Sequence, residues 1–261
     1  MKNKVVWITG ASSGIGEALV YAYSNLGARL ILSSRNRDEL YRVKTACKSP
    51  VNIHVLPLDL ENTASLADKA QEAIRIYGHI DLLINCGGIS QRGFALETTL
   101  ETEQRIMNVN FWGTVALSKA VLPDMIAKGG GKVVCISSLV GKFGTRFRST
   151  YSASKHALHG YFDSLRSEVY DKNIQITLIC PGFIKTSVTL NALTGSGGTY
   201  GIMDDALANG MSPEECARHI VKAITANKEE VYIGGKEVMA VWLKRFFPLR
   251  LSKYLRTAKV N

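Results

Sequence analysis

The sequence predicts a single-domain α/β fold over residues 1–261, a doubly wound parallel sheet with helices on both faces. Short runs rich in β-branched residues alternate with helix-length amphipathic stretches, and strands that are apolar throughout are typical of a sheet buried on both sides. The chain is 46% apolar and 21% charged, which is enough to bury a sizeable core. No repeat or linker divides it. The predicted strands are 5–9, 30–33, 53–56, 82–85, 133–137 and 176–180.

The first strand leads into a glycine-rich turn. After Thr9 comes the segment 10–16, Gly-Ala-Ser-Ser-Gly-Ile-Gly, and a helical pattern follows over 17–26. Glycine permits the tight turn and a close backbone approach, while the first turn of the helix offers unpaired N–H groups to an anion. The spacing G-x-x-x-G-x-G in this position predicts a Rossmann-type dinucleotide loop. A purely structural corner between strand and helix is the alternative.

The residues after the second strand predict which cofactor is bound. They are Ser34 and Arg35, at a position where an NAD-dependent enzyme is expected to carry an acid for the ribose hydroxyls. Arg35 can hold a 2′-phosphate through two charge-assisted bonds, and the missing carboxylate removes a repulsion. The sequence therefore predicts NADP(H). The alternative is that Arg35 begins a solvated stretch, 35–39, that leads into a helix. Asp59, after the third strand, is a candidate for the adenine edge.

The fifth strand and the helix after it carry the candidate catalytic residues. A long amphipathic helix from Tyr151 to about Tyr170 places Tyr151 and Lys155 one turn apart on one face. Tyrosine is a weak acid at neutral pH, and a nearby ammonium stabilises its phenolate. Ser138 ends the strand 133–137, at the edge where a parallel sheet presents its ligand site. Ser138, Tyr151 and Lys155 together predict a proton-transfer site. A Tyr-x-x-x-Lys pair without such a context more often lies exposed on the surface of a helix.

These motifs make the chain similar to the short-chain dehydrogenase/reductase family, in particular to NADP-preferring members that handle lipids and steroids. The resemblance covers residues 5 to about 233. Its motifs, in the family's order, are the loop 9–16, Asp59, Asn85-Cys86-Gly87-Gly88, Asn108-Val109-Asn110, Ser138, Tyr151 with Lys155, and Pro181-Gly182. The family usually has Asn-Asn-Ala-Gly after the fourth strand, so Cys86 is a mild departure that loses an amide able to brace the sheet.

The resemblance implies a role for each of these residues. Tyr151 would donate or accept the hydroxyl proton, and Ser138 would position the carbonyl. Lys155 would bind the nicotinamide ribose and act on Tyr151, while Asn110 would hold a water that relays protons. The implied cofactor residues are Gly10, Ser12, Ser13, Gly14, Ile15, Gly16, Ser34, Arg35, Asp59, Leu60, Asn85, Gly87, Tyr151, Lys155, Pro181, Gly182, Ile184 beside the nicotinamide ring and Thr186 at its carboxamide.

Three segments are expected to converge over the nicotinamide and to select the substrate: 89–94, 139–149 and the substrate loop 183–210. They offer few acids, and Arg146 and Arg148 either meet an anionic group or are solvated. An apolar pocket is predicted from Leu139, Val140, Phe143, Phe147, Val188, Leu190 and Leu193. Within the substrate loop, Thr194 to Gly201 is too rich in glycine for regular structure and predicts a mobile loop.

The C-terminal part begins with a helix predicted at Ser212-Pro213, where serine caps and proline fits the first turn. Of the net charge of +10, much lies in the basic amphipathic tail 236–261, where seven Lys and Arg accompany only Glu237. Aromatic, leucine and cationic residues interleave there, so the tail can rest on an anionic membrane, cover the active site or join a dimer interface. No nucleic-acid-binding motif is present, and the protein is not expected to bind nucleic acid.

Cysteine usage and the N-terminus predict a cytoplasmic protein. The five cysteines, at 47, 86, 135, 180 and 216, are odd in number and widely spaced, as expected of reduced thiols. The first strand starts at Val5 and leaves no room for a signal peptide, and no apolar run reaches the roughly 18 residues of a spanning helix. No metal site is predicted, and His156 and His159 are expected to be packing or surface residues.

The prediction is therefore an oxidoreductase that interconverts a carbonyl and an alcohol by hydride transfer with NADP(H), on an apolar small molecule. Family resemblance implies a homodimer or homotetramer with the helices around the fifth strand at the interface. The rival hypothesis is a regulatory protein that senses NADP(H) without turnover. Loss of Tyr151 or Lys155 would mark such a protein, and both are present.

Overall fold

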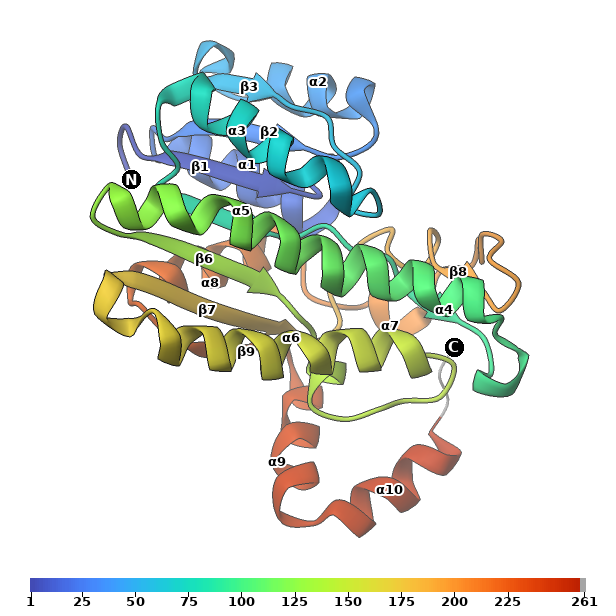
Figure 1. The fold of residues 1–261 in the computed structure, drawn as a ribbon. Coiled ribbons are helices and arrows are strands. Elements are labelled where there is room, and N and C mark those ends of the chain that lie inside the picture. Colours follow the sequence, from blue (N-terminus) through green and yellow to red (C-terminus); the bar gives the residue numbers. More distant parts are fainter. Residues whose placement is uncertain (259–261) are drawn as a thin grey trace.

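The computed structural model describes residues 1–258. Seven parallel strands form one sheet in the order β3-β2-β1-β4-β6-β7-β9, and helices cover both of its faces (Figure 1). The predicted doubly wound α/β fold is confirmed. The strands are β1 (Val5–Thr9), β2 (Arg29–Ser33), β3 (Ile53–Val55), β4 (Leu82–Asn85), β6 (Gly131–Ile136), β7 (Ile174–Pro181) and β9 (Glu230–Ile233).

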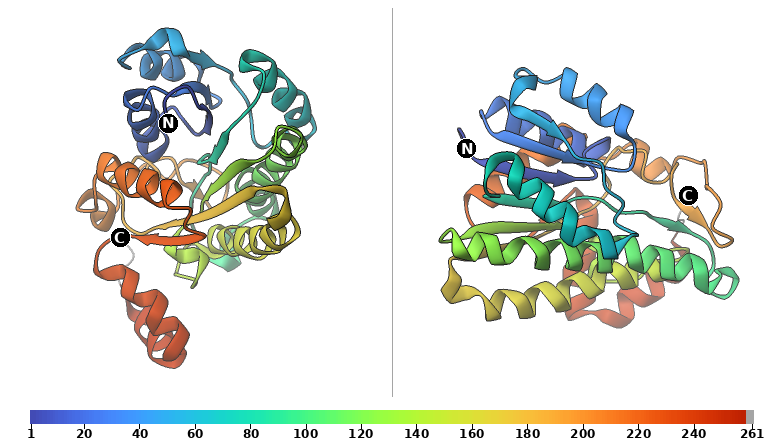
Figure 2. Two further views of the ribbon diagram at one scale, coloured as in Figure 1. Left: turned by 90° about the vertical axis from the view of Figure 1, so that its left-hand side faces the viewer. Right: turned by 45° about the horizontal axis from the view of Figure 1, so that its top comes forward.

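Two hydrophobic cores lie on the two faces of the sheet. Val6 and Ile8 of β1 point into one core and Val5 and Trp7 into the other, because successive side chains of a strand alternate. Figure 2 shows the two helix layers from the side. The first core is covered by α1 (Gly14–Asn25), α2 (Arg37–Thr45) and α8 (Pro213–Thr225), and the second by α3 (Leu66–Tyr77), α5 (Gly113–Ala127) and α6 (Ser149–Glu168).

The order of the strands places the site. From β1 the chain builds the sheet outward through β2 and β3, then returns to add β4 on the other side of β1. Ligands of open α/β sheets bind at the carboxyl ends of the strands where the order reverses. Beyond this edge, β5 (Gln91–Arg92) and β8 (Leu193–Thr194) pair as a parallel ribbon that joins the segment after β4 to the loop after β7. The short helix α7 (Asp205–Ala208) follows.

Several elements differ from the prediction. The strand β9 was not predicted, because Glu230, Val231 and Tyr232 at the edge of the sheet are only half-buried and the run is short. The ribbon of β5 and β8 has two residues in each strand, too few for a pattern, and it takes Thr194 out of the predicted loop. The helix α8 does begin as predicted, with the Ser212 hydroxyl accepting the N–H of Glu215 at 3.1 Å.

The tail forms a helical hairpin of α9 (Met239–Phe246) and α10 (Pro248–Thr257), which projects from the domain in Figure 1. Val241 and Leu251 are buried in a third cluster beside Leu139 and Phe143, against which Tyr151 also packs. The last three residues of the tail, 259–261, lie outside the described residues. Within residues 1–258 no helix combines the length and the apolar character that crossing a bilayer requires.

Candidate active site

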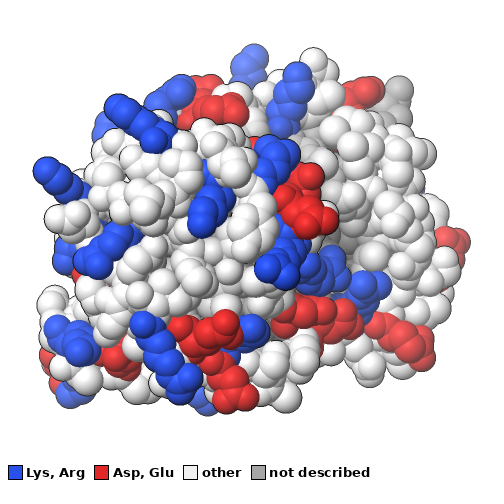
Figure 3. Space-filling model, turned by 90° about the horizontal axis from the view of Figure 1, so that it is seen from above, with Lys and Arg blue, Asp and Glu red and all other residues white. Residues whose placement is uncertain are grey.

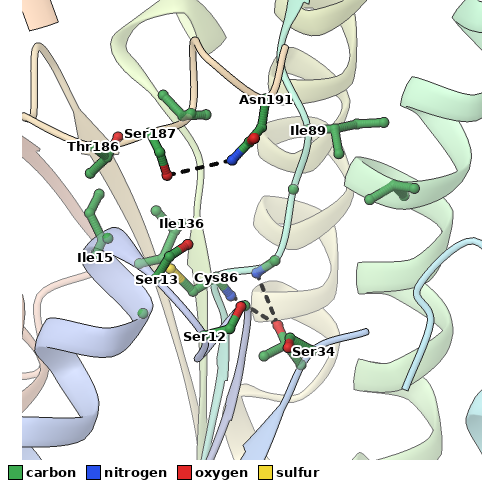
Figure 4. Close-up of a pocket in the computed structure, with 18 of the residues that line it drawn as sticks. Ser12, Ser13, Ile15, Ser34, Cys86, Ile89, Ile136, Thr186, Ser187 and Asn191 are labelled. Carbon is green, nitrogen blue, oxygen red and sulfur yellow. Dashed lines mark hydrogen bonds between the residues drawn. The ribbon is translucent and has the colours of Figure 1, made fainter. Parts of the chain in front are cut away.

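A cavity of about 740 Å³ lies at the carboxyl edge of the sheet. Its wall comes from residues at or after the ends of β1, β2, β4, β6 and β7, on both sides of the point where the strand order reverses. In Figure 4, Ser34 and Ser187 lie on opposite sides of it. Most of the predicted cofactor residues line it: Gly10, Ser12, Ser13, Gly14, Ile15, Gly16, Ser34, Arg35, Asp59, Leu60, Gly87, Tyr151, Lys155, Pro181, Gly182, Ile184 and Thr186.

The turn after β1 fits a pyrophosphate. Gly10 and Gly14 have φ angles of +64° and +57°, which favour glycine. A Cβ on Gly10 would lie 2.8 Å from the backbone of Gly87, so the turns after β1 and β4 are in close contact. Ser13 precedes α1 without a capping bond from its side chain, and residues 14–16 of the first helical turn line the cavity. Free N–H groups at a helix start bind phosphate oxygens.

The turn after β4 is tied to β1 by Thr9, whose hydroxyl accepts the N–H groups of Cys86 and Gly87, each at 3.1 Å. Asn85 was predicted to bind the cofactor, but it does not line the cavity. It is buried, and its Nδ2 donates to the Ser118 hydroxyl at 3.0 Å, so it braces β4 against α5 instead. Cys86 does line the cavity, and burial raises the pKa of its thiol to about 12.

The end of the cavity predicted to hold the adenosine is lined by Ser34 and Arg35. Arg35 is exposed and precedes α2, which begins at Arg37 and is capped by the Asn36 side chain. Among the described residues no carboxylate is paired with Arg35, so its guanidinium is available to a ligand. Glu39, which sequence analysis did not single out, also lines this end, and its carboxylate is paired with Nε of Arg42 at 2.7 Å.

The turn after β3 completes this end. Asp59 and Leu60 line the cavity, and the Asp59 carboxylate accepts the N–H of Glu61 at 3.0 Å, which fixes the carboxylate in the turn. A Cβ on Gly87 would lie 2.6 Å from Cδ1 of Leu60. Because this atom is the far end of a flexible side chain, a Cβ at position 87 would displace only the end of Leu60, and the turns after β3 and β4 lie in close contact here.

Three of the four predicted catalytic residues line the cavity together: Ser138, Tyr151 and Lys155. Lys155 is buried, its Nζ donates to the Ile136 carbonyl at 2.9 Å and lies 5.7 Å from the centre of the Tyr151 ring. The Ser138 hydroxyl contacts the Pro181 carbonyl at 3.4 Å. The β6 strand and α6 thus bring a hydroxyl, a phenol and an ammonium to one wall, as the sequence predicted.

Asn110, the fourth, lies behind this wall in a π-helical turn, Asn108–Trp112, between α4 (Leu100–Met107) and α5. Such turns are frequent at functional sites. Its amide exchanges two hydrogen bonds with the backbone of Ile89, at 2.8 and 2.9 Å. A Cβ on Gly88 would lie 3.1 Å from Oδ1 of Asn110 and 3.6 Å from Nζ of Lys155. The glycine therefore leaves room between these two groups.

The substrate side is lined differently from the prediction. Ile89, Val188, Leu193 and Leu207 give it apolar character, and Ser187 adds a hydroxyl. No residue of 139–149 lines the cavity, because the tail hairpin covers this segment and buries three of its apolar side chains in the third cluster. Residues predicted for the pocket that do not line it are Leu139, Val140, Phe143, Phe147 and Leu190.

Neither of the two arginines of that segment lines the cavity, and Arg146 is exposed, as its solvated alternative expects, whereas Arg148 is not. Arg146 lies over the rings of Phe94 and Phe147, at 5.9 and 5.1 Å from their centres. Arg148 donates to the Asp204 carboxylate at 2.9 Å and is largely buried. The prediction that they meet an anionic substrate is therefore not supported by their contacts.

His159 belongs to a buried network behind Lys155. Its ring nitrogens contact the Ser137 hydroxyl and the Glu230 carboxylate, each at 3.1 Å. Burial raises the pKa of Glu230, but hydrogen bonds from His159, Lys142 and Tyr232 outweigh it and lower that pKa to about 2. The expected packing role of His159 fits these contacts. Within residues 1–258 no three His, Cys, Asp or Glu side chains gather as a metal site.

Glu230 is expected to make the free energy of unfolding depend on pH in the acidic range. Because its pKa is depressed in the folded state, its contribution is present above the ordinary value of 4.5 and is lost as pH falls toward about 2. Glu230→Gln should lower the free energy of unfolding by about 1–2 kcal/mol at neutral pH, and this deficit should shrink below about pH 4.5. Urea unfolding across this range, with the exposed Glu229→Gln as control, measures it. A deficit that does not change with pH would exclude this cause.

Comparison with known proteins gives one family. A sequence profile of the family described as short chain dehydrogenase matches residues 4–195. A dehydrogenase/reductase SDR family protein 7-like of Anopheles gambiae is 46% identical in an alignment of 258 positions that covers 95% of this chain and 80% of the relative. The dehydrogenase/reductase SDR family member 7B of Bos taurus is 41% identical in an alignment of 256 positions that covers 95% of this chain and 79% of the relative.

Solved structures share the architecture. A short-chain dehydrogenase from Streptomyces avermitilis superposes with a TM-score of 0.83 at 25% identity, over 98% of this chain and 97% of that one. A short-chain dehydrogenase/reductase from Burkholderia phymatum, solved in complex with NAD, superposes with a TM-score of 0.86 at 20% identity, over 100% and 98%. At 20% identity, the likeness to the second structure shows the fold alone.

Proposed function

Because this chain belongs to the short-chain dehydrogenase/reductase family, and is therefore an oxidoreductase with a nicotinamide cofactor, we propose that it interconverts a carbonyl and an alcohol with NADP(H). One observation carries the proposal. Ser138, Tyr151 and Lys155 line the same cavity as the glycine-rich turn 10–16. A dinucleotide on that turn would extend toward the three side chains, so hydride and proton transfer would take place in one site.

The proposed division of labour follows from the contacts. Bound nicotinamide supplies or takes up the hydride. Tyr151 gives its phenolic proton to the carbonyl oxygen in reduction and takes it back in oxidation. Ser138 donates a hydrogen bond to the same oxygen and orients it. Lys155 spends one N–H on the Ile136 carbonyl, which leaves two for the cofactor ribose and keeps a positive charge beside the Tyr151 ring.

Asn110 is proposed to support the proton path from Lys155. Its side chain is committed to Ile89 and to the Ser154 hydroxyl at 3.0 Å. Its amide therefore fixes the wall beside Gly88 rather than reaching the substrate. The space above Gly88, between Asn110 and Lys155, is where we place the relaying water.

The choice of NADP(H) is supported by Ser34 and Arg35 at the adenosine end. A guanidinium binds a phosphate through paired hydrogen bonds. Glu39 is a carboxylate beside Ser34 and Arg35 that would repel a 2′-phosphate, and its pairing with Arg42 reduces this repulsion. For the substrate we propose a small apolar carbonyl or alcohol, because Ile89, Val188, Leu193 and Leu207 surround its end of the cavity.

The protein is proposed to be cytoplasmic and to form a homodimer or homotetramer through α5 and α6. Five unpaired cysteines support a reducing compartment. We propose no nucleic-acid partner. On the face seen in Figure 3, Lys and Arg are interspersed with Asp and Glu rather than gathered in a continuous basic patch.

The outer face of the tail hairpin is proposed to rest on an anionic membrane surface. Met239, Trp242 and Phe246 follow one another along α9 and are 70%, 56% and 65% exposed, and the two rings stack with centres 6.3 Å apart. Lys253 and Arg256 of the exposed face of α10 add positive charge. Exposed aromatic side chains accompanied by cationic ones are typical of helices at membrane surfaces, and the shared charge opposes self-association of the hairpin.

Vesicle flotation tests this contact. The protein is expected to float with vesicles that contain phosphatidylserine and to stay below with phosphatidylcholine alone. Trp242→Ser with Phe246→Ser should reduce flotation at least about tenfold, because each buried aromatic contributes over 1 kcal/mol. Leu96→Ser, a change at a fully exposed leucine elsewhere, is the control. Equal flotation of both variants, or self-association in place of flotation, would contradict the membrane contact and favour a dimer interface.

A further inference from the structure

The helix that carries Tyr151 and Lys155 is capped by a residue from another element. Gln91 of β5 is fully buried, and its Oε1 accepts the N–H of Thr150 at 2.9 Å and that of Tyr151 at 3.3 Å. The residue before the helix, Arg148, offers no side-chain acceptor. Helix starts need acceptors for their first N–H groups. Gln91 therefore holds the backbone of Tyr151 itself.

The next residue of β5 binds the substrate loop. Arg92 is buried, and its Nε donates to the Asp204 carboxylate at 3.3 Å while Nη2 forms a close ion pair with it. Arg148, just before α6, donates to the same carboxylate at 2.9 Å. A third arm, Nη1 of Arg92, donates to the Gln91 carbonyl at 3.0 Å. One carboxylate thus ties the loop to β5 and to the start of the catalytic helix.

The cluster depends on this single carboxylate. Asp204 is 2% exposed and faces two guanidinium groups, and burial together with Arg92 lowers the pKa of Arg148. Nε of Arg148 has no hydrogen-bond partner among the described residues. Without the carboxylate, two buried cations would face one another unpaired, which is strongly unfavourable. The loop that Asp204 holds supplies Ser187, Val188, Asn191, Leu193, Gly197, Thr199 and Leu207 to the cavity wall.

We infer that Gln91, Arg92 and Asp204 form a positioning clasp that fixes the substrate loop 183–210 against the helix carrying Tyr151. This inference deepens the proposed function and rests on it for its catalytic consequence. The loop and Tyr151 both line the cavity in which a carbonyl would be held. The clasp joins the loop to the start of this helix through six residues of three segments, namely Gln91, Arg92, Arg148, Thr150, Tyr151 and Asp204. None of Gln91, Arg92 and Asp204 lines the cavity.

Hydrogen exchange of the full-length protein tests the clasp without any substrate. Asp204→Asn should raise the exchange rate of loop amides within 183–210 at least about tenfold, because the loop opens locally. Asp205→Asn, a change at the exposed neighbouring aspartate, is the matched control and should match the parent protein. Gln91→Met should instead raise exchange at Thr150 and Tyr151. Loop exchange that is the same in Asp204→Asn, Asp205→Asn and the parent protein overturns the clasp.

Kinetics separate positioning from a structural role. With benzaldehyde and NADPH, Asp204→Asn should raise KM about tenfold or more with a smaller change in kcat, since loosening a wall that contacts the substrate removes binding of ground state and transition state alike. The dissociation constant of NADPH should change little. Gln91→Met should lower kcat more than it raises KM, because it acts on Tyr151. A fall in kcat alone for Asp204→Asn overturns its proposed hold on the loop.

Failure of the proposed function and failure of the clasp give different results. If the parent protein does not reduce benzaldehyde or cyclohexanone, the proposed function is in question, while the exchange experiment still decides the clasp. If Asp204→Asn does not fold, Arg92→Met replaces it, because that variant breaks the bond between β5 and Asp204 and leaves the carboxylate paired with Arg148. Faster loop exchange in Arg92→Met, with far-UV circular dichroism unchanged, supports the clasp. Unchanged loop exchange in that folded variant overturns it.

Discussion

Replacing Tyr151 by phenylalanine is expected to lower kcat by roughly 10²–10⁴-fold, the usual contribution of a positioned acid or base. The phenol is the only phenolic hydroxyl lining the cavity in the described part of the chain, and Lys155 lies 5.7 Å from the centre of its ring. Phenylalanine keeps the ring that packs against the third cluster, so the fold and NADPH binding should persist. Single-turnover oxidation of NADPH with a panel of apolar aldehydes and ketones measures the loss.

The matched control lies on the same helix. Tyr161→Phe removes a phenol that packs on Phe111 in the second core, with ring centres 6.0 Å apart, away from the cavity. It should leave turnover unchanged. Substantial turnover by Tyr151→Phe would remove Tyr151 from its proposed role. If the parent protein binds NADPH but oxidises it with no carbonyl of the panel, the hypothesis of a regulatory NADP(H) sensor gains support.

Changing Arg35 to aspartate is expected to reverse the preference of the protein for NADPH. The parent protein should bind NADPH about 2 kcal/mol more tightly than NADH, roughly thirtyfold, which is the usual value of a charge-assisted hydrogen bond to a phosphate. The aspartate repels the 2′-phosphate and offers a carboxylate to ribose hydroxyls, so NADH should become the better ligand. Fluorescence titration of the parent protein and the variant with both nucleotides measures the change.

Arg37→Asp is the control for this substitution. Arg37 is two residues away and exposed, but it lies over the Tyr41 ring at 5.5 Å and does not line the cavity. Its variant should keep the NADPH preference. Equal affinities of the parent protein for NADPH and NADH would contradict the cofactor choice. Failure to bind either nucleotide would contradict the whole assignment of the site.

The periodic parts of the chain were predictable from sequence because their signals are local. Strand β1 is recognisable because burial on both faces makes residues 5–9 mostly apolar. The turn after it is recognisable because its positive φ angles favour Gly10 and Gly14. Spacing along one helix likewise brought Tyr151 and Lys155 together. These predictions needed no knowledge of distant contacts.

Predictions that depended on distant contacts were less successful. Asn85 carries a family motif, yet its amide turns to Ser118 of α5, a contact that no local pattern encodes. Segment 139–149 was predicted to line the substrate pocket, but the tail hairpin covers it. The cap that Gln91 provides to α6 joins residues about sixty positions apart. Short ribbons such as β5 with β8 lack the length from which a period can be read.

The packing of α1 against α8 has a consequence for how the protein is made. Within the first core, Leu19 and Tyr23 of α1 lie in the same cluster as Cys216 and Ile220 of α8. The face of α1 that packs on α8 thus stays uncovered until the ribosome has added nearly two hundred further residues. Parallel sheets with such distant pairings fold slowly and expose apolar surface meanwhile. A nascent chain therefore completes its nucleotide site late, although the site begins at residue 9.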